Sequence, residues 1–281
     1  MNYLKQFEYV IAIADAGSIS KAADMLNIAQ PTLSKYLSKI EADNKVEFFD
    51  RSISPIKLTK AGEEFIKTGY QMISLDKQLK KQLADNKDVL SINIGISPSR
   101  APYILPQALK KFFDSHSNCS VHIKEENTTR LNEDLANGQL DMIISLKDDN
   151  NKDFEYVHLF DENVYVVKNI KDMNKPYDEL PLISYQNGRY MHEIVNSYFP
   201  RKQANVISES ISTALALVKN GLGYTIVPSY IVKYGIDDNL YFEEIKSSIE
   251  RNVCLFYRKQ QFLSQSERQF IECVVNSIKS V

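Results

Sequence analysis

The sequence of residues 17–40 is GSISKAADMLNIAQPTLSKYLSKI, and this stretch decides how the N-terminal part of the chain folds. Gly17 predicts the end of a preceding helix, because glycine readily adopts the left-handed conformation that follows helix C-termini. Ser18 is a favoured N-cap for the next helix, and Pro31 fits the first turn of another, where its missing N–H is not needed. The stretch therefore predicts two short helices joined by a tight connection.

Apolar residues give each of these two helices an inward face. Ala22 and Ala23 form a narrow face that lets another helix approach closely, and the second helix carries Leu33, Leu37 and Ile40 inward. The outer face of the second helix is left polar and partly basic. Two helices, a short turn and such a face are what readout of the DNA major groove requires.

The flanking segments extend this prediction on both sides. Upstream, an apolar stripe at helical spacing predicts a first helix, and its members are Leu4, Phe7, Ile11 and Ala14. Downstream, residues 48–51 and 56–58 predict a short two-stranded wing around Ser52–Pro55. The N-terminal part is therefore expected to be a helix-turn-helix with a wing.

A long helix is expected after the wing, beginning with Thr59 as its cap and reaching about Asp85. Its apolar residues Phe65, Met72 and Leu79 recur with heptad spacing, which indicates a seam that pairs with a second helix. We expect this linker helix to form a dimer. The alternative is that it packs only on its own domain.

Beyond Leu90, short β-like runs alternate with helix-like segments. The expected strands are residues 91–96, 120–124, 141–145, 163–167, 182–184, 223–227 and 252–257, and the expected helices are residues 102–113, 129–137, 191–199, 211–220 and 264–275. Such alternation predicts α/β lobes with mostly parallel sheets, whose ligands bind at the carboxyl ends of the strands.

The composition is that of a folded globular chain, with 43% hydrophobic and 25% charged residues. Its 281 residues suit two domains better than one core. No apolar run approaches the roughly 18 residues of a membrane helix, and the N-terminus lacks the pattern of a signal peptide. The three cysteines are too far apart to indicate a disulfide framework or a metal site, which points to a cytoplasmic protein.

The net charge of −2 argues against a polycation that wraps nucleic acid. DNA binding then requires a local basic face rather than a basic protein. Residues 21–60 are slightly basic and the part after residue 90 is slightly acidic, so the charge distribution by itself is weak evidence.

Taken together, these residues resemble the LysR-type transcriptional regulators. The likeness is carried by Gly17–Leu26, Gln30–Ser34, Glu41, Phe49–Arg51, Leu58–Gly62, Ile94-Gly95, Ser97–Ser99, Leu105-Pro106, Leu135, Gly138, Leu140-Asp141, Gly221–Gly223 and Pro228. These pieces follow the family's own order over essentially the whole chain. The resemblance implies an all-α winged helix-turn-helix at residues 1–58 and a linker and dimerisation helix at residues 59–88.

The resemblance also implies an α/β effector-binding domain at residues 89–281 that is similar to periplasmic binding proteins. Such a domain has two lobes with the effector between them. Lobe I is expected at about residues 89–161 and 251–281, and lobe II at about residues 162–250.

The resemblance, combined with side-chain chemistry, assigns DNA binding to Ser20, Lys21, Gln30, Pro31, Thr32, Ser34, Lys35, Arg51 and Lys57. Gln30 can pair its amide with adenine N6 and N7, and Pro31 and the Thr32 methyl can touch thymine methyls. Lys35 suits phosphate or guanine, and Arg51 suits the DNA backbone or the minor groove. The plainer interpretation of Gln30 and Lys35 is a solvated helix surface.

The sequence departs from the family at two places. The family usually has serine where Ala29 stands, as cap of the recognition helix, and leucine-glycine where Asn44-Lys45 stand. Loss of a capping hydroxyl costs roughly 1 kcal/mol. We expect Asn44 to replace glycine, because asparagine tolerates the left-handed conformation, and Asp50 to orient Arg51.

The effector is expected in the cleft between the lobes. Its candidate ligands are Ser97, Ser99, Arg100, Thr128, Ser184, Tyr185 and Gln186. Hydroxyls and free N–H groups at strand ends and helix starts suit anions, and Arg100 and Arg189 are candidate carboxylate partners. The plainer alternatives are exposed arginines and a Tyr185 that only lines the cleft. The identity of the effector is left open.

Two other classes of protein fit less well. An enzyme is disfavoured because no nucleophile elbow, P-loop or paired metal-ligand spacing occurs, and the histidines are isolated, namely His116, His122, His158 and His192. A periplasmic solute-binding protein fits only the C-terminal half. We therefore expect a DNA-binding regulator without enzymatic activity or cofactor. Its expected partners are double-stranded operator DNA, a small anionic effector, further copies of itself as a dimer or tetramer, and RNA polymerase.

Overall fold

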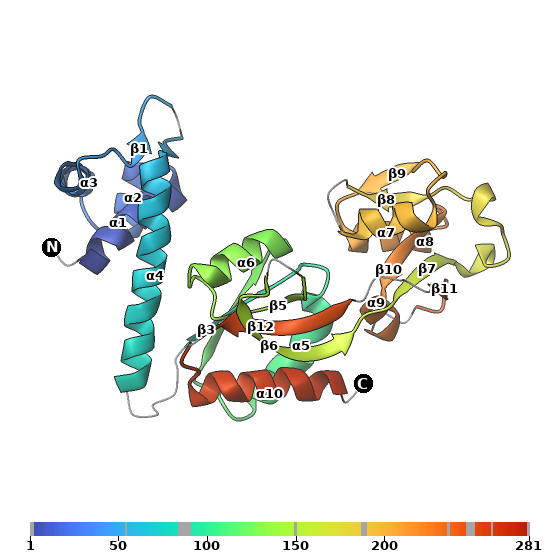
Figure 1. The fold of residues 1–281 in the computed structure, drawn as a ribbon. Coiled ribbons are helices and arrows are strands. Elements are labelled where there is room, and N and C mark those ends of the chain that lie inside the picture. The colour runs from blue at the N-terminus through green and yellow to red at the C-terminus, as the bar shows by residue number, and fades with distance from the viewer. Residues whose placement is uncertain are drawn as a thin grey trace.

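The computed structural model describes residues 3–53, 55–83, 91–148, 151–186, 190–234, 237–245, 251–259 and 261–279. Along the chain lie a helical N-terminal part, the long linker helix α4 (Lys60–Leu83) and two α/β lobes (Figure 1). No helix in this described part of the chain is long and apolar enough to cross a membrane.

The N-terminal part contains α1 (Tyr3–Ala16), α2 (Ile19–Met25) and α3 (Gln30–Asn44). Gly17 ends α1 with a φ of +60°, and the Ser18 hydroxyl accepts a hydrogen bond from Lys21 N as the N-cap of α2. Pro31 lies in the first turn of α3. The predicted inward faces are buried in one core, which includes Ala22, Ala23, Leu33, Leu37 and Ile40. The helix boundaries predicted from residues 17–40 are therefore confirmed.

The end of α3 differs from the prediction. Lys45, and not Asn44, takes the left-handed conformation, with φ 57° and ψ 33°. Asn44 remains helical, and its side-chain amide donates to Ile40 O at 2.8 Å. This bond favours the helical conformation of Asn44, so the reversal falls one residue later. Because left-handed backbone is unfavourable for residues with a Cβ atom, Lys45 carries strain where the family usually has glycine.

The wing consists of β1 (Phe49–Asp50) and β2 (Lys57–Leu58), which pair antiparallel. Helix α4 follows, capped as predicted by Thr59, whose Oγ1 accepts a hydrogen bond from Gly62 N at 3.1 Å. A Cβ atom at Gly62 would lie 2.2 Å from Phe48 O. Only glycine therefore lets the first turn of α4 approach the backbone at the entry to the wing so closely.

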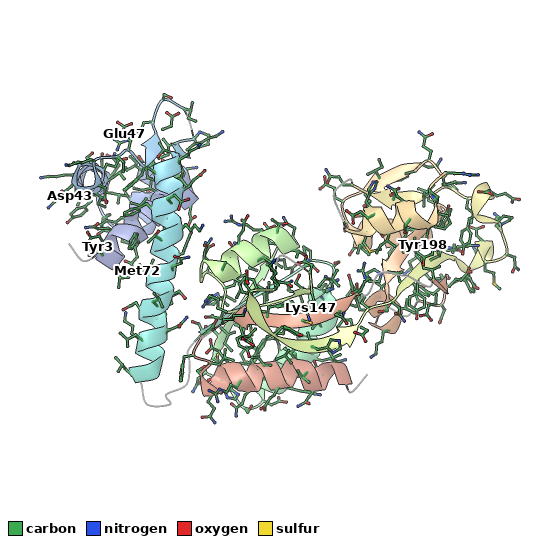
Figure 2. All side chains as sticks on the ribbon, in the orientation of Figure 1. Tyr3, Asp43, Glu47, Met72, Lys147 and Tyr198 are labelled. Carbon is green, nitrogen blue, oxygen red and sulfur yellow. The ribbon has the colours of Figure 1, made fainter. Side chains whose placement is uncertain are left out.

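The apolar stripe of α4 is only partly exposed. Phe65 packs into the N-terminal core, with its ring centroid 4.7 Å from that of Phe7 and 4.3 Å from that of Phe48. The prediction of an exposed seam is therefore wrong at Phe65, because the first turns of α4 complete the core of their own domain. The exposed apolar residues lie further along, at Met72, Leu75, Leu79 and Leu83, and Figure 2 shows Met72 on the free stretch of α4.

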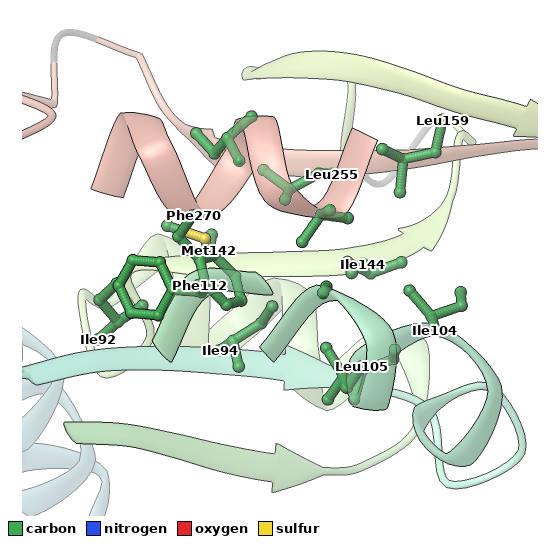
Figure 3. Close-up of a cluster of buried hydrophobic side chains, with 14 of the residues drawn as sticks. Ile92, Ile94, Ile104, Leu105, Phe112, Met142, Ile144, Leu159, Leu255 and Phe270 are labelled. Carbon is green, nitrogen blue, oxygen red and sulfur yellow. The ribbon is translucent and has the colours of Figure 1, made fainter. Parts of the chain in front are cut away.

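Lobe I is built on one five-stranded sheet in the order β4-β3-β5-β12-β6. Its strands are β3 (Ser91–Ile96), β4 (Ser120–Glu125), β5 (Met142–Leu146), β6 (Phe154–Asp161) and β12 (Asn252–Arg258). Its helices are α5 (Ala101–Phe113), α6 (Thr128–Ala136) and α10 (Gln265–Lys279). Helix α6 covers one face of the sheet and α5 and α10 cover the other (Figure 1). Figure 3 shows the core that α5 and α10 share with the sheet, where Phe112 of α5 meets Phe270 of α10 near Ile92 of β3.

Lobe II contains a three-stranded sheet in the order β10-β7-β11 and a two-stranded sheet of β8 and β9. The strands are β7 (Val164–Asn169), β8 (Ile183–Tyr185), β9 (Val206–Ser208), β10 (Tyr224–Pro228) and β11 (Leu240–Ile245). The helices are α7 (Tyr190–Tyr198), α8 (Ile211–Lys219) and α9 (Ser229–Tyr234), with short 3₁₀ turns at Ile170–Asp172 and Tyr177–Glu179. This lobe has its own hydrophobic core.

The expectation of mostly parallel sheets is wrong. Strands β4, β3 and β5 are parallel, but β12 and β6 are antiparallel to their neighbours, as are β10, β7 and β11. The chain crosses from lobe I to lobe II after β6 and returns before β12, so these two strands run in opposite directions. The strands β6, β9 and β11, absent from the prediction, are each at the edge of a sheet. Edge strands bury fewer side chains and therefore give a weaker apolar pattern.

Candidate functional site

The residues predicted to bind DNA come from α2, from the first turns of α3 and from the wing region. Eight of the nine are exposed and Ser34 is half-buried. The exposed ones are Ser20, Lys21, Gln30, Pro31, Thr32, Lys35, Arg51 and Lys57. Because Leu33 and Leu37 of the same helix are fully buried, α3 presents one polar side to solvent and one apolar side to the core.

Arg51 is held by α3 and not by its neighbour in the sequence. Its guanidinium contacts the carboxylate of Glu41 at 2.5 Å, and the other oxygen of that carboxylate accepts a hydrogen bond from Phe48 N at 2.9 Å. Asp50 instead accepts hydrogen bonds from Ser52 N and Ser52 Oγ, which lower the pKa of Asp50. The expectation that Asp50 orients Arg51 is therefore wrong. Glu41 does so, because it is buried between α3 and the wing.

A second polar site lies at the carboxyl ends of the parallel strands of lobe I. Ser97 and Ser99 follow β3, and their hydroxyl oxygens are 3.3 Å apart. Thr128 begins α6, and its Oγ1 accepts a hydrogen bond from Ser145 Oγ of β5 at 3.4 Å. Neighbouring parallel strands end at one edge, so these hydroxyls occupy a common edge of the sheet.

Arg100 is fixed by a buried ion cluster at the crossing between the lobes. Its guanidinium contacts both carboxylate oxygens of Glu162, at 3.1 and 3.2 Å, and donates to Ser97 Oγ at 3.3 Å. Arg251 donates to the same carboxylate from Nε at 2.8 Å and from its terminal nitrogen as well. The Glu162 side chain is 0% exposed. Arg100 also stacks over the ring of Tyr230, 5.6 Å from its centroid.

This cluster corrects the assignment of Arg100 as a ligand for the effector. The charge of Arg100 is already used to neutralise a buried carboxylate, and burying that carboxylate without a partner would be strongly unfavourable. Glu162 N also donates to Arg251 O at 2.8 Å, which joins the two strands of the crossing directly. Arg100 therefore positions the crossing and the adjacent serines.

In lobe II the candidate effector ligands Ser184, Tyr185 and Gln186 have different environments. Tyr185 is buried, and its hydroxyl donates to Ile226 O at 2.9 Å, with burial raising the pKa of Tyr185. Tyr185 is therefore wrong as a ligand residue, because it belongs to the core of the lobe. Ser184 is also buried, but its hydroxyl has no hydrogen-bond partner in the described part of the chain. Gln186 is exposed, and Arg189 lies outside the described residues.

Sequence reasoning missed the partners of these residues. The buried pairing of Glu162 and Arg251 could not be predicted, because the sequence around an isolated charged residue does not show whether that residue is buried. Ser145 and Asn132 were also missed. Asn132 is only 7% exposed, and neither atom of its amide has a hydrogen-bond partner among the described residues. A polar residue inside the apolar run of β5 was the one available signal for Ser145.

Among the described residues, the metal-ligating side chains and the cysteine thiols form no further candidate site. No group of three or more His, Cys, Asp or Glu side chains in those residues could hold a metal ion. Cys119 and Cys254 are buried, Cys273 is half-buried, and all three are free thiols. Burial raises the pKa of both Cys254 and Cys273.

Comparisons with known proteins point to one family for both the N-terminal and the C-terminal part of the chain. The model of the bacterial regulatory helix-turn-helix protein, lysR family, matches residues 4–63, and that of the LysR substrate binding domain matches residues 87–279. The uncharacterized HTH-type transcriptional regulator YcgK of Bacillus subtilis is 26% identical over 98% of this chain and 95% of its own. The DNA-binding transcriptional dual regulator OxyR of Escherichia coli is 24% identical over 96% and 94%.

Solved structures share the fold over the full length. Full-length OxyR of Pseudomonas aeruginosa, a cysteine variant, superposes with a TM-score of 0.77 at 23% identity and covers 99% of this chain and 95% of that chain. Full-length CbnR in complex with its target DNA gives a TM-score of 0.67 at 22% identity and covers 99% and 100%. At these identities the likeness shows the fold.

Replacing Arg100 tests its structural role without any ligand. Arg100→Ala removes one of the two arginines from Glu162, while Arg251 still neutralises the carboxylate. We expect the free energy of unfolding to fall by about 1.5–3 kcal/mol, the contribution of hydrogen bonds to a charged group. Urea unfolding followed by circular dichroism measures this change. The exposed Arg201→Ala is the control and is expected to change stability by less than about 0.5 kcal/mol. A loss below about 1 kcal/mol for Arg100→Ala would contradict the role assigned to it.

Proposed function

Because this chain belongs to the LysR family of bacterial transcription regulators, we propose that it reads operator DNA through α3 and the wing, under the control of a small anionic metabolite bound between its lobes. The observation that carries the proposal is a helix-turn-helix with its predicted contact residues facing solvent, joined to the substrate binding domain of the family. The DNA-bound CbnR structure, with the same fold, supports it.

Base readout is assigned to the first turns of α3. Gln30 is exposed and uncharged, so it can discriminate bases only through hydrogen bonds from its amide, which suits adenine. Pro31 and Thr32 beside it offer apolar contacts to thymine methyl groups. Ser34 and Lys35 contact phosphate or guanine. Ala29 provides no capping side chain, Pro31 has no N–H, and Thr32 N already donates to Ala29 O at 2.9 Å. The Gln30 N–H is therefore the group of the first turn that is left for solvent or a DNA phosphate.

The charges around α3 provide attraction that does not depend on sequence. Arg51 is held by Glu41 at the wing, and Lys57 lies on β2. Lys21, with the hydroxyl of Ser20, adds a contact from α2. In this arrangement Arg51 meets the DNA backbone beside the wing, and Glu41 reduces the cost of ordering the Arg51 side chain when DNA binds.

The effector site is proposed at the strand ends of lobe I and the facing edge of lobe II. Ser97, Ser99 and Thr128 supply hydroxyls there, and the first N–H groups of α6 favour negative charge. Ser184 supplies a buried hydroxyl that has no other partner in the described part of the chain, and Gln186 supplies an exposed amide. Uncharged donors with helix N-termini suit a small carboxylate or similar anion.

Peroxide sensing is the alternative that the relatives suggest, since several are named hydrogen peroxide-inducible genes activators. The cysteines of this chain do not favour it. Oxidation requires an accessible thiolate, whereas Cys119 and Cys254 are buried and burial raises the pKa of Cys254 and Cys273. A bound metabolite therefore explains the substrate binding domain better than thiol oxidation does.

Assembly is proposed through the free stretch of α4. Met72, Leu75, Leu79 and Leu83 follow each other at helical spacing and are exposed in the single chain. A second copy that covers this stripe gives a dimer, and pairing of dimers through the lobes gives a tetramer. Such an assembly places two recognition helices on successive half-sites of operator DNA. Bound there, in the cytoplasm, it contacts RNA polymerase.

The first test separates base readout from general attraction. Gln30→Ala should weaken operator binding by roughly 1–3 kcal/mol while hardly affecting random DNA, and should leave the salt dependence unchanged. Arg51→Ala should weaken binding to both and reduce the slope of log K against log salt by about 1. Binding isotherms at several salt concentrations, on operator fragments selected from genomic DNA and on scrambled duplexes, measure both. An equal loss on both duplexes for Gln30→Ala would contradict base readout by Gln30.

The second test concerns the effector site. Ser99→Ala combined with Thr128→Val removes two hydroxyls and should abolish the inducer response of an operator-driven reporter while basal DNA binding is retained. Ser120→Ala is the matched control, because Ser120 is an exposed serine at the opposite end of β4. A normal response of the double variant would place the effector elsewhere.

The third test concerns assembly. Met72→Asp puts a carboxylate on the proposed seam, where burial without a partner is unfavourable, so sedimentation velocity should show smaller species and operator binding should weaken. Met173→Asp is the control, since Met173 is 42% exposed and Met72 is 43% exposed. An unchanged oligomer in Met72→Asp would show that the stripe is not the seam.

A further inference from the structure

The turn after α6 lies directly against the linker helix. This Gly138 turn, which we define as residues 137–140, contains Gly138 with a φ of +78°. A Cβ atom at position 138 would lie 2.4 Å from Ser74 Cβ and 2.5 Å from Ser74 Oγ of α4. Two segments from different domains of one chain therefore meet at a contact that admits no side chain at position 138.

Arg258 of β12 binds both sides of this contact. One terminal nitrogen of its guanidinium donates to Leu135 O at 2.8 Å and to Leu140 O at 2.7 Å, which hold the end of α6 and the turn. The other terminal nitrogen donates to Ser74 Oγ at 3.2 Å. The planar guanidinium thus ties the C-terminal end of α6, the Gly138 turn and the linker helix into one unit.

Neighbouring side chains extend the contact. Tyr70, one turn before Ser74 on α4, lies beside the turn, with its carbonyl oxygen 3.6 Å from the Cβ position of residue 138. Burial raises the pKa of Tyr70 to about 12. Asp15 of α1 lies within electrostatic range of Lys124 and Arg130 of lobe I. The contact therefore involves the domain that carries the recognition helix as well as the linker.

The other end of α6 is the proposed effector end. Thr128 opens the helix and accepts the hydrogen bond from Ser145, while Ala136 ends it beside the Gly138 turn. The helix has 9 residues, which gives a length of roughly 13 Å. A short rigid helix thus joins the proposed effector site to the linker helix, and a displacement at one end must appear at the other.

Asn132 gives α6 a buried amide that is unpaired among the described residues. It lies one helical turn after Thr128 and therefore on the same side of α6. Its amide is buried with neither polar atom paired among the described residues, and such groups destabilise the arrangement that leaves them unpaired. A polar ligand at the start of α6, or a small shift of the helix, would give this amide a partner.

We propose that α6 couples effector binding to operator binding, by transmitting its position through the Gly138 turn to the linker helix of the same chain. This rests on the proposed function, because it needs both an operator and an effector site. Coupling between two sites is reciprocal. Operator DNA bound at α3 must then alter α6, which allows a test without the effector.

The experiment uses hydrogen–deuterium exchange of the full-length protein with and without its operator duplex. In the wild type, we expect the exchange rate of the α6 amides to change by about fivefold or more when operator binds, the lower end of typical coupling between linked sites. In Gly138→Ala the added Cβ displaces the turn from Ser74. The operator still binds, and the change at α6 falls below about twofold.

Two matched variants isolate the contact from backbone strain. Gly221→Ala has the same strain, with a φ of +81°, but a Cβ atom there meets nothing within 4 Å, so its α6 response should equal that of the wild type. Adding Ser74→Gly to Gly138→Ala removes the two closest atoms and leaves Tyr70 O at 3.6 Å as the next neighbour. This double variant restores the close approach but lacks the hydrogen bond from Arg258 to Ser74 Oγ, so its response should lie between those of Gly138→Ala and the wild type.

Should Gly138→Ala fail to fold, Ser74→Leu introduces the obstruction from the side of the linker helix and should show the same loss of response. A response of wild-type size in Gly138→Ala or Ser74→Leu, with operator bound, overturns the coupling role of α6. A wild-type protein that binds no duplex sequence-specifically overturns the proposed function itself, and the coupling with it.

Discussion

The buried carboxylate of Glu162 is the interaction on which the two-lobed half of the molecule depends. It lies where the chain crosses between the lobes, and it is neutralised by Arg100 from the start of α5 and Arg251 from the returning strand. A buried charge of this kind is tolerated only when its partners are in place. The crossing between the lobes and the start of α5 must therefore keep one position relative to each other. That position also fixes Ser97, whose hydroxyl accepts a hydrogen bond from Arg100, and Ser99 beside it.

The N-terminal half depends on a different constraint, which is close packing of aromatic rings. Phe65 stacks between Phe7 and Phe48, and a Cβ atom at Gly69 would lie 2.7 Å from the ring of Phe7. These contacts attach the first turns of α4 to α1 and to the wing, so the direction of α4 is set by the helix-turn-helix itself. The later turns of α4 are left free to meet a second copy on one side and the Gly138 turn on the other.

The two halves differ in how their polar groups are used. In the DNA-facing half, eight of the nine predicted contact residues are exposed, and one of these, Arg51, is held by Glu41. In the lobes, several polar groups that suit a ligand are already paired within the protein, as Arg100 and Tyr185 are. What remains for an effector is a set of hydroxyls at the strand ends, together with Ser184 and Asn132, whose buried polar atoms have no hydrogen-bond partner in the described part of the chain.

The sequence by itself determined the helix-turn-helix, the cap of α4 at Thr59 and most strands and helices of the lobes, because local caps, turns and apolar periodicity act over a few residues. It also indicated which polar residues of α3 face solvent, since their apolar neighbours must face the core. Only the tertiary structure decided that Phe65, which is half-buried, packs against Phe7 and Phe48, and that Arg100 serves Glu162. Each of these depends on a partner elsewhere in the chain, 62 positions away for Arg100 and Glu162. Side-chain pairing across such separations is set by the packing of whole elements, which no local pattern records.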